Sequence, residues 1–221
     1  MPRMIARPWV VLLAAGGSRR FGRPKQLARI AGESILRRAV RSAVAIAPGG
    51  CVVVLGAQAE RLRQELSGLP AQVVVNRAWR RGLSSSLVAG LDALPQTARA
   101  ALLVLADQAS LGPGDLALVA AAWQARPRSV VASLAGGVLG PPAVFPRRHF
   151  GELRRLRGDQ GARDLLRHPG RPVVVIELPA AALDVDTPAD AARVRQRTSR
   201  ARTPRSAQPS PARPPRSSGG T

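Results

Sequence analysis

The sequence predicts an α/β fold, a single doubly wound, mainly parallel sheet with helices on both faces. The chain has 221 residues, of which 45% are hydrophobic, and this suits one domain with a proper core. Short runs rich in β-branched residues alternate with amphipathic stretches of helical length, which is the rhythm of a parallel sheet. The apolar runs are continuous, as expected of strands that are covered on both faces.

Six valine- and leucine-rich runs are expected to form the strands, beginning with WVVLLAA. In chain order these strands are expected at 9–15, 51–56, 72–76, 100–107, 129–134 and 172–178. Helices are expected at 33–47, 57–67, 84–94, 113–125, 147–156, 160–167 and 188–197. The first four helices lie between successive strands, so they serve as the crossovers that a parallel sheet requires.

The chain divides into a lead, a domain and a tail. Residues 1–8 precede the first strand, and residues 9–197 hold the alternating elements. From residue 198 onward the sequence lacks large apolar side chains and is dominated by arginine, proline, serine and glycine. Such a segment cannot bury enough surface to offset the entropy lost on ordering. Residues 198–221 are therefore expected to form a disordered basic tail.

The formal net charge of +21 comes almost entirely from arginine, since Lys25 is the only lysine. Nucleic-acid-binding surfaces combine clustered basic residues with stacking aromatic residues or a recognisable motif. Here the arginines are spread over expected helices and loops without aromatic interleaving. We therefore expect no specific nucleic-acid partner, and non-specific adhesion to polyanions remains open.

Cysteine content and hydropathy exclude further classes of protein. Cys51 is the only cysteine, so one chain can form neither a disulfide framework nor a cysteine metal cluster. The longest apolar run, 9–15, is too short to span a bilayer, and the lead lacks the apolar region of a signal peptide. The sequence thus favours a cytoplasmic enzyme with no membrane association.

A glycine- and arginine-rich loop, residues 16–25, follows the first strand. Ligands of open parallel sheets bind at the carboxyl ends of strands, and small residues let backbone amides approach phosphates. The dinucleotide fingerprint G-x-G-x-x-G is absent, and Lys25 is not part of a P-loop because it lies between Pro24 and Gln26. The loop instead reads L-A-A-G-x-S-x-R-F-G-x-x-K.

This pattern closely resembles the signature loop of the molybdenum cofactor cytidylyltransferase-like family of nucleotidyltransferases. The resemblance implies that Lys25 and Arg20 act on the phosphates of a nucleoside triphosphate as catalytic residues. A compact ammonium is suited to lie between phosphate oxygens as a point charge. The resemblance also implies nucleotide contacts from the end of the first expected strand and the start of the loop. These residues are Leu13, Ala14, Ala15, Gly16, Gly17 and Ser18.

The segment 76–91 resembles a second nucleotide-contacting segment of the same family. The resemblance implies nucleotide contacts from Asn76, Gly82, Ser85 and Ser86. Serine is also a good N-cap, so the serine run alternatively only begins a helix.

Two aspartates are implied as ligands of Mg²⁺. Asp107 ends an expected strand in a segment that resembles the family's D-Q-P motif, although Ala109 replaces the usual proline. Asp184 and Asp186 lie in a segment that closes the resemblance, and Asp186 is the preferred second ligand. Carboxylates at the carboxyl end of a strand are well placed to meet a triphosphate through the metal.

The segment 137–166 is similar to the acceptor side of the family. Gly140, Pro141, Arg147 and Arg163 are the implied acceptor contacts, and each arginine is alternatively a solvated helix residue. The resemblance as a whole implies Mg²⁺-dependent transfer of a nucleotidyl group, with release of pyrophosphate, to a phosphorylated small-molecule acceptor. CTP and molybdopterin are the first choice, and a molybdoenzyme or its chaperone would be the protein partner. GTP, another acceptor, or a non-catalytic nucleic-acid-binding or regulatory role remain the alternatives.

Overall fold

The computed structural model describes residues 7–18, 21–22, 24–167, 172–185, 187 and 189–194. Arg20, Asp186 and the basic tail 198–221, all singled out from the sequence, lie outside the described residues. Their expected roles and the expected disorder of the tail stay predictions.

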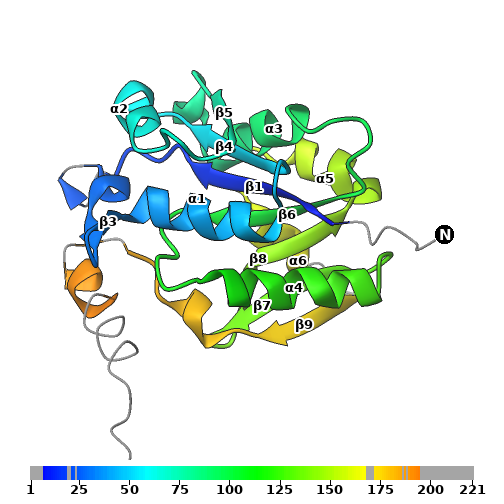
Figure 1. Cartoon of the computed structure of the whole chain (residues 1–221). Helices are drawn as coiled ribbons and strands as arrows, with labels where there is room; N and C mark the ends of the chain where they lie inside the picture. Colours follow the sequence, from blue (N-terminus) through cyan, green and yellow to red (C-terminus); the bar gives the residue numbers. More distant parts are fainter. Residues whose placement is uncertain are drawn as a thin grey trace, which may run out of the picture.

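A seven-stranded sheet forms the centre of the molecule, in the order β5-β4-β1-β6-β8-β7-β9 (Figure 1). The strands of this sheet are β1 (Trp9–Ala14), β4 (Cys51–Leu55), β5 (Gln72–Val75), β6 (Ala100–Leu105), β7 (Val130–Ala135), β8 (Val138–Pro146) and β9 (Val173–Glu177). Neighbouring strands are parallel except for β8, which is antiparallel to both β6 and β7. The predicted α/β fold with a mainly parallel sheet is confirmed.

Helices cover both faces of this sheet, as Figure 1 shows. The helices are α1 (Ile35–Ile46), α2 (Ala59–Gln64), α3 (Leu83–Asp92), α4 (Pro113–Ala125), α5 (Phe150–Arg155) and α6 (Ala162–Leu166). Side chains of β1 alternate between two apolar clusters because successive residues of a strand point to opposite faces. Val10 and Leu12 pack with α1, α2 and α4, whereas Val11 and Leu13 pack with α3, α5 and α6.

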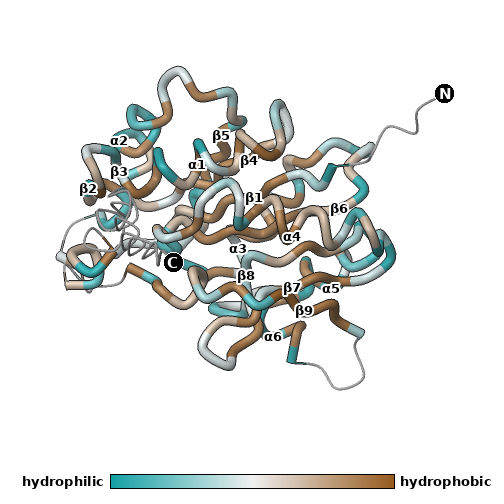
Figure 2. Tube along the Cα trace, turned by 60° about the horizontal axis from the view of Figure 1, so that its bottom comes forward, coloured by the Kyte–Doolittle hydropathy of each residue, from teal (hydrophilic) through white to brown (hydrophobic). Residues whose placement is uncertain are grey.

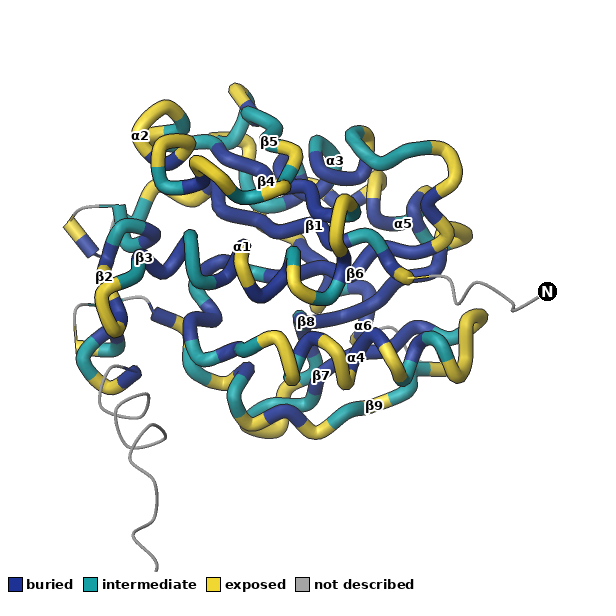
Figure 3. Tube along the Cα trace, in the orientation of Figure 1, coloured by how far each residue is buried: buried dark blue, intermediate teal, exposed yellow. Residues whose placement is uncertain are grey.

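The central strands are therefore hydrophobic along their whole length (Figure 2) and buried (Figure 3). In β4, all five residues are buried, which explains the continuous apolar run CVVVL. The expectation that both faces are covered is confirmed for the central strands, whereas the edge strands β5 and β9 are only partly buried.

One strand of the central sheet, β8, was not expected from the sequence. Residues 137–146 were expected only to carry acceptor contacts, but 138–146 form the whole of β8. The run contains Gly140, Pro141 and Pro142, and glycine and proline are depleted in strands because they weaken or interrupt the hydrogen-bond ladder. The register between β7 and β8 shifts between Ala132 and Ser133, opposite this run.

A short hairpin was also missed. Strands β2 (Arg29–Ile30) and β3 (Glu33–Ser34) pair with each other, directly before α1. Ile30 belongs to a third apolar cluster, which also holds Ala109 after β6 and Val185 near the end of the described chain. This cluster joins three segments far apart in the sequence beside the carboxyl ends of β1 and β6.

Cys51 is buried at the start of β4, and burial raises the pKa of its thiol to about 12. Because the thiolate is the reactive form, we expect iodoacetamide at pH 8 to leave Cys51 unmodified in the native protein and to modify it after unfolding in guanidinium. Mass spectrometry measures the label, and Cys51→Ser is the blank. Rapid labelling of the native protein would contradict this prediction.

Within the described residues, no helix combines the length and the hydrophobicity that crossing a bilayer requires.

Candidate functional site

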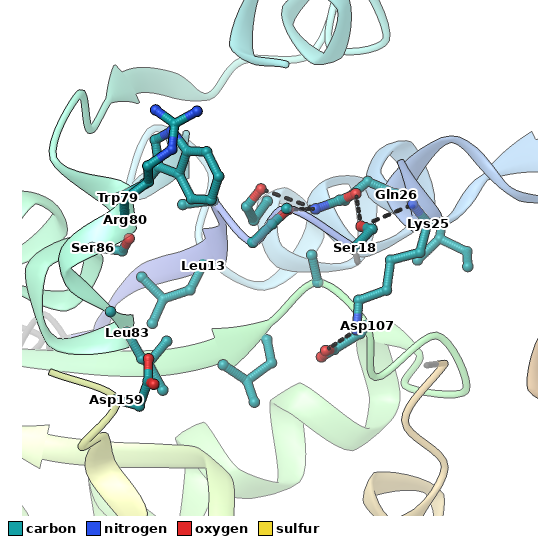
Figure 4. A pocket seen from close by; sticks show the side chains of 18 residues that line it. Leu13, Ser18, Lys25, Gln26, Trp79, Arg80, Leu83, Ser86, Asp107 and Asp159 are labelled. Carbon is teal, nitrogen blue, oxygen red and sulfur yellow. Dashed lines mark hydrogen bonds and ion pairs between the residues drawn. The ribbon is translucent and has the colours of Figure 1, made fainter. Parts of the chain in front are cut away.

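A cavity of about 590 Å³ lies where β1 and β6 end (Figure 4). Most residues that the sequence analysis assigned to the nucleotide, the phosphates or the metal line it, namely Leu13, Ala14, Ala15, Gly16, Gly17, Ser18, Lys25, Gly82, Ser86 and Asp107. They come from the end of β1, the loop after it, the loop after β6 and the start of α3. The parallel sheet brings these segments together because the carboxyl ends of its strands meet there.

Lys25 and Asp107 form an ion pair at the floor of this cavity. Nζ of Lys25 donates to Oδ2 of Asp107 over 2.7 Å, and the two side chains are 14% and 25% exposed (Figure 4). The other oxygen of Asp107, Oδ1, is buried and has no hydrogen-bond partner. The pocket therefore holds a cation and a carboxylate in contact, and the two groups are 82 residues apart in the chain.

The glycine loop, residues 15–18, is held by Gln26, a residue that also lines the cavity and to which sequence reasoning gave no role. Gln26 is only 4% exposed, and its Nε2 donates to the carbonyl oxygens of Ala14 and Gly16. Its Oε1 accepts a hydrogen bond from Oγ of Ser18, which in turn accepts one from the backbone N–H of Lys25. A glutamine directly after the loop lysine was the available signal.

The second nucleotide segment is organised by Asn76. Its Nδ2 donates to the hydroxyl oxygens of Ser85 and Ser86, and its Oδ1 accepts from the N–H of Ala78. Of these residues, only Ser86 is among those that line the cavity. Asn76 and Ser85 thus hold the turn before α3 through their polar atoms, and the nucleotide contacts expected of them stay predictions.

Gly82 is fixed by a close approach of two backbones. A Cβ atom there would lie 2.3 Å from the carbonyl carbon and oxygen of Gly158, and its φ of +98° is in the region that favours glycine. The hydroxyl and the N–H of Ser84 both donate to that same carbonyl oxygen. The segment 157–161 is thus docked on the start of α3, and it places Asp159 in the cavity lining.

We expect Gly82→Ala to lower the free energy of unfolding by about 2 kcal/mol or more, through backbone strain and the clash with Gly158. Chemical denaturation measures this loss. Gly114→Ala is the matched control, because a Cβ at Gly114 meets nothing within 4 Å and its φ is not positive. Equal stability of the two variants would contradict the close approach.

The expected acceptor residues separate into two groups. Arg147 lies at the amino end of β6, where its backbone N–H donates to the carbonyl of Arg99 and its guanidinium donates to the carbonyl of Ala98. The cavity lies at the other end of β6, its carboxyl end, so the acceptor contact expected of Arg147 is wrong for this cavity. The β8 strand that the sequence analysis missed carries Arg147 away from the pocket.

Gly140, Pro141 and Arg163 lie on the pocket side of the sheet, although none of the three lines the cavity. A Cβ at Gly140 would lie 3.4 Å from Nε of Arg163, and the carbonyl of Pro141 accepts a hydrogen bond from Nε2 of Gln108. Gln108, which follows Asp107 and is 5% exposed, also donates to the carbonyl of Ala181. This second buried glutamine was missed as well, and it joins the loop of Asp107 to the expected acceptor side.

The comparison with known families agrees with this arrangement of strands, loop and pocket. Residues 10–173 match the family model described as the MobA-like NTP transferase domain. The chain belongs to this family. The resemblance inferred from the motifs, and with it the assignment as a nucleotidyltransferase, is confirmed.

Relatives of this MobA-like transferase carry different names. A protein called nicotine blue oxidoreductase, from Paenarthrobacter nicotinovorans, is 35% identical over 170 residues, which are 71% of this chain and 80% of that protein. The 2-C-methyl-D-erythritol 4-phosphate cytidylyltransferase of Stenotrophomonas maltophilia is 36% identical over 121 residues, 51% of each chain. The proteins similar to this one therefore include one that is named a cytidylyltransferase.

Solved structures match the fold of the MobA-like transferase over most of the chain. Rv0371c from Mycobacterium tuberculosis has a TM-score of 0.72 at 30% identity, and the match covers 86% of this chain and 98% of that one. The same protein in complex with manganese has a TM-score of 0.71 at 27% identity.

The described residues of the transferase fit a divalent cation that is shared with substrate. Among them, no group of three histidine, cysteine, aspartate or glutamate side chains is placed to hold a metal. Asp107 supplies one carboxylate, whose Oδ1 has no hydrogen-bond partner. The backbone carbonyl of Asp107 accepts a hydrogen bond from the N–H of Val185 over 2.9 Å. Mg²⁺ commonly uses one or two carboxylates and completes its shell with water and phosphate.

Proposed function

We propose that this transferase moves a cytidylyl group from CTP to a phosphorylated small molecule, with Mg²⁺ as cofactor and release of pyrophosphate. The observation that carries the proposal is the Lys25–Asp107 ion pair in the cavity at the carboxyl ends of β1 and β6. A phosphate-binding cation beside a carboxylate is what a triphosphate and its metal require. CTP is supported by the cytidylyltransferase relative and by Ala15, because the guanylyltransferases that the loop also resembles more often have glycine at this position.

The chain's own groups would act by positioning and by neutralising charge. A phosphate oxygen of the acceptor attacks the α-phosphorus of CTP in line, the new P–O bond forms, and the bond to the β-phosphate oxygen breaks to release pyrophosphate. Lys25 stabilises negative charge on the phosphates, and Asp107 is the residue that would hold the metal. When bound, the metal supplies further charge neutralisation on the phosphate oxygens. No side-chain nucleophile is needed.

Molybdopterin is our choice of acceptor, supported by the GPPAVF and RGDQGAR segments that resemble cytidylyltransferases acting on this compound. Gly140, Pro141 and Arg163 would line its side of the site, and Arg20 and Asp186 would add a phosphate contact and a second metal ligand. This function places the protein in the cytoplasm, with a molybdoenzyme or its chaperone as the receiver of the product.

Pyrophosphate release with each of the four nucleoside triphosphates tests the proposal, with and without Mg²⁺ and molybdopterin. We expect release that depends on all three of CTP, Mg²⁺ and molybdopterin. Preference for GTP would assign the alternative nucleotide, and release only with another phosphorylated compound would replace the acceptor. The full chain should also be assayed for consumption of NADH or NADPH, because a relative bears the name of an oxidoreductase. No turnover with any of these substrates would overturn the proposal in favour of a non-catalytic role.

A further inference from the structure

We propose that Gln26 is a positioning residue for the triphosphate, through its hold on the peptide groups of the glycine loop. This inference rests on the proposed function, since it requires a triphosphate in the cavity. It concerns a buried side chain that lines the cavity, holds the loop by hydrogen bonds and is not used by the reaction scheme above.

Gln26 fixes the orientation of the peptide group between Gly16 and Gly17. Nε2 of Gln26 donates to the carbonyl oxygen of Gly16 over 2.9 Å. Because a trans peptide is planar, with its C=O and N–H pointing in opposite directions, this bond turns the N–H of Gly17 away from Gln26. The neighbouring carbonyl of Ala15 is also engaged, by the N–H of Ala57 over 3.1 Å. The orientation of successive peptide groups in the loop is thereby fixed.

Three backbone N–H groups of the loop are left available to a ligand. Within the described part of the chain, the N–H groups of Gly16, Gly17 and Ser18 donate to no protein acceptor, and all three residues line the cavity. A Cβ placed on Gly16 would meet nothing within 4 Å, so the space beside this residue is open to a ligand. Backbone N–H groups grouped in a loop of this kind form a concave site for anions.

Ser18 has an unusual backbone conformation. Its φ of +52° is costly for a residue other than glycine, and its hydroxyl is held between Oε1 of Gln26 and the N–H of Lys25. The carboxamide of Gln26 therefore holds the peptide groups that face the cavity. It also holds Ser18, whose hydroxyl accepts a hydrogen bond from the N–H of Lys25. Only a neutral amide suits this position, because it must donate to two carbonyls and accept from a hydroxyl.

Two variants of nearly the same size separate this role from simple packing. Gln26→Glu replaces the donating amide by a carboxylate that faces two carbonyl oxygens, and Gln26→Met removes the polar atoms altogether. We expect both to raise the Kd of CTP with Mg²⁺, and of inorganic triphosphate, by at least about tenfold, because aligned donors to charged phosphates are lost. The affinity for cytidine, which has no phosphate, should not change. Isothermal titration and competition measure these constants.

Trp123→Phe is the matched control for stability. The indole Nε1 of Trp123 donates to the carbonyl of Pro127, and the side chain is 2% exposed near the end of α4 that lies away from the cavity. This variant also loses one partly buried hydrogen bond, so it should lower the melting temperature without changing triphosphate affinity. Ser18→Ala removes two hydrogen bonds of the network, the one to Oε1 of Gln26 and the one from the N–H of Lys25, from a half-buried side chain. It supplies the same test with a smaller expected rise in Kd if a Gln26 variant does not fold.

The outcomes are distinct. Wild-type protein that binds neither CTP nor inorganic triphosphate would overturn the proposed function and this inference together. Wild-type binding with unchanged triphosphate affinity in the folded variants would overturn the role of Gln26 alone. An equal loss of affinity for cytidine and for triphosphate would also overturn it, because Gln26 would then act only through the fold.

Discussion

Replacement of Lys25 by alanine is expected to lower kcat/KM for CTP by about 10²-fold or more. Removing one preorganised charge from a site where negative charge is stabilised costs on the order of 3 kcal/mol of transition-state stabilisation. Lys25→Arg should restore little of this loss, because a planar guanidinium cannot replace a compact ammonium in contact with Asp107. The measurement is steady-state kinetics by pyrophosphate release, with melting temperatures recorded for each variant.

Arg29→Ala is the control for the loss of positive charge as such. Arg29 lies four residues from Lys25, but its guanidinium donates to the carbonyl of Gly32 on the surface, and its side chain is 63% exposed. We expect this variant to turn over like the wild type. Equal activity of Lys25→Ala and the wild type would show that Lys25 does not contact the phosphates.

The ion pair adds a second readout to the same variant. In Lys25→Ala, Oδ2 of Asp107 loses the hydrogen bond from Nζ, and Oδ1 already lacks a partner. An anionic carboxylate without a neighbouring cation attracts other cations more strongly. Mn²⁺ should therefore bind to nucleotide-free Lys25→Ala more tightly than to the wild type, and this can be measured by electron paramagnetic resonance even though turnover falls.

Asp107→Asn is expected to keep the fold and to lower turnover by about 10³-fold, since a metal contributes several kcal/mol of charge stabilisation and an amide oxygen holds it poorly. The substitution preserves the size of the side chain, and the backbone carbonyl can still accept from Val185. CTP titrations with and without Mg²⁺ should reveal whether the metal-dependent part of the affinity is lost. Turnover is then measured by pyrophosphate release.

Two aspartates serve as comparisons. Asp92→Asn removes a carboxylate that is 57% exposed and pairs with Arg154 at the end of α3, so we expect neither binding nor turnover to change. Asp184→Asn, at an exposed position one residue before Val185, should matter less than Asp107→Asn. If Asp107→Asn binds CTP with Mg²⁺ and turns over like the wild type, the metal is held elsewhere.

The sequence by itself determined the fold class and most of the cavity lining. Continuous apolar runs identify buried strands because both faces of a parallel sheet are covered, and β1, β4 and β6 follow this rule except at the half-buried Trp9 and Leu105. The loop after β1 was recognised because its glycines, Ser18 and Lys25 act within a few residues of one another. Local patterns of this kind are visible in one dimension.

Tertiary structure alone decided the direction of β8 and the partners of the buried polar groups. Because β8 runs antiparallel to β6, Arg147 lies at the amino end of β6 while Gly140 lies near its carboxyl end, and no local pattern marks that reversal. Lys25 pairs with Asp107, and Gln108 donates to the carbonyl of Pro141. The partners in each pair are far apart in the chain, and no pattern in the sequence predicts that they are in contact. Gln26 acts through nearby residues, yet its role depends on being buried with its amide toward two carbonyls. A polar side chain reads the same in a sequence whether it is solvated or buried, and only the packing around it distinguishes the two.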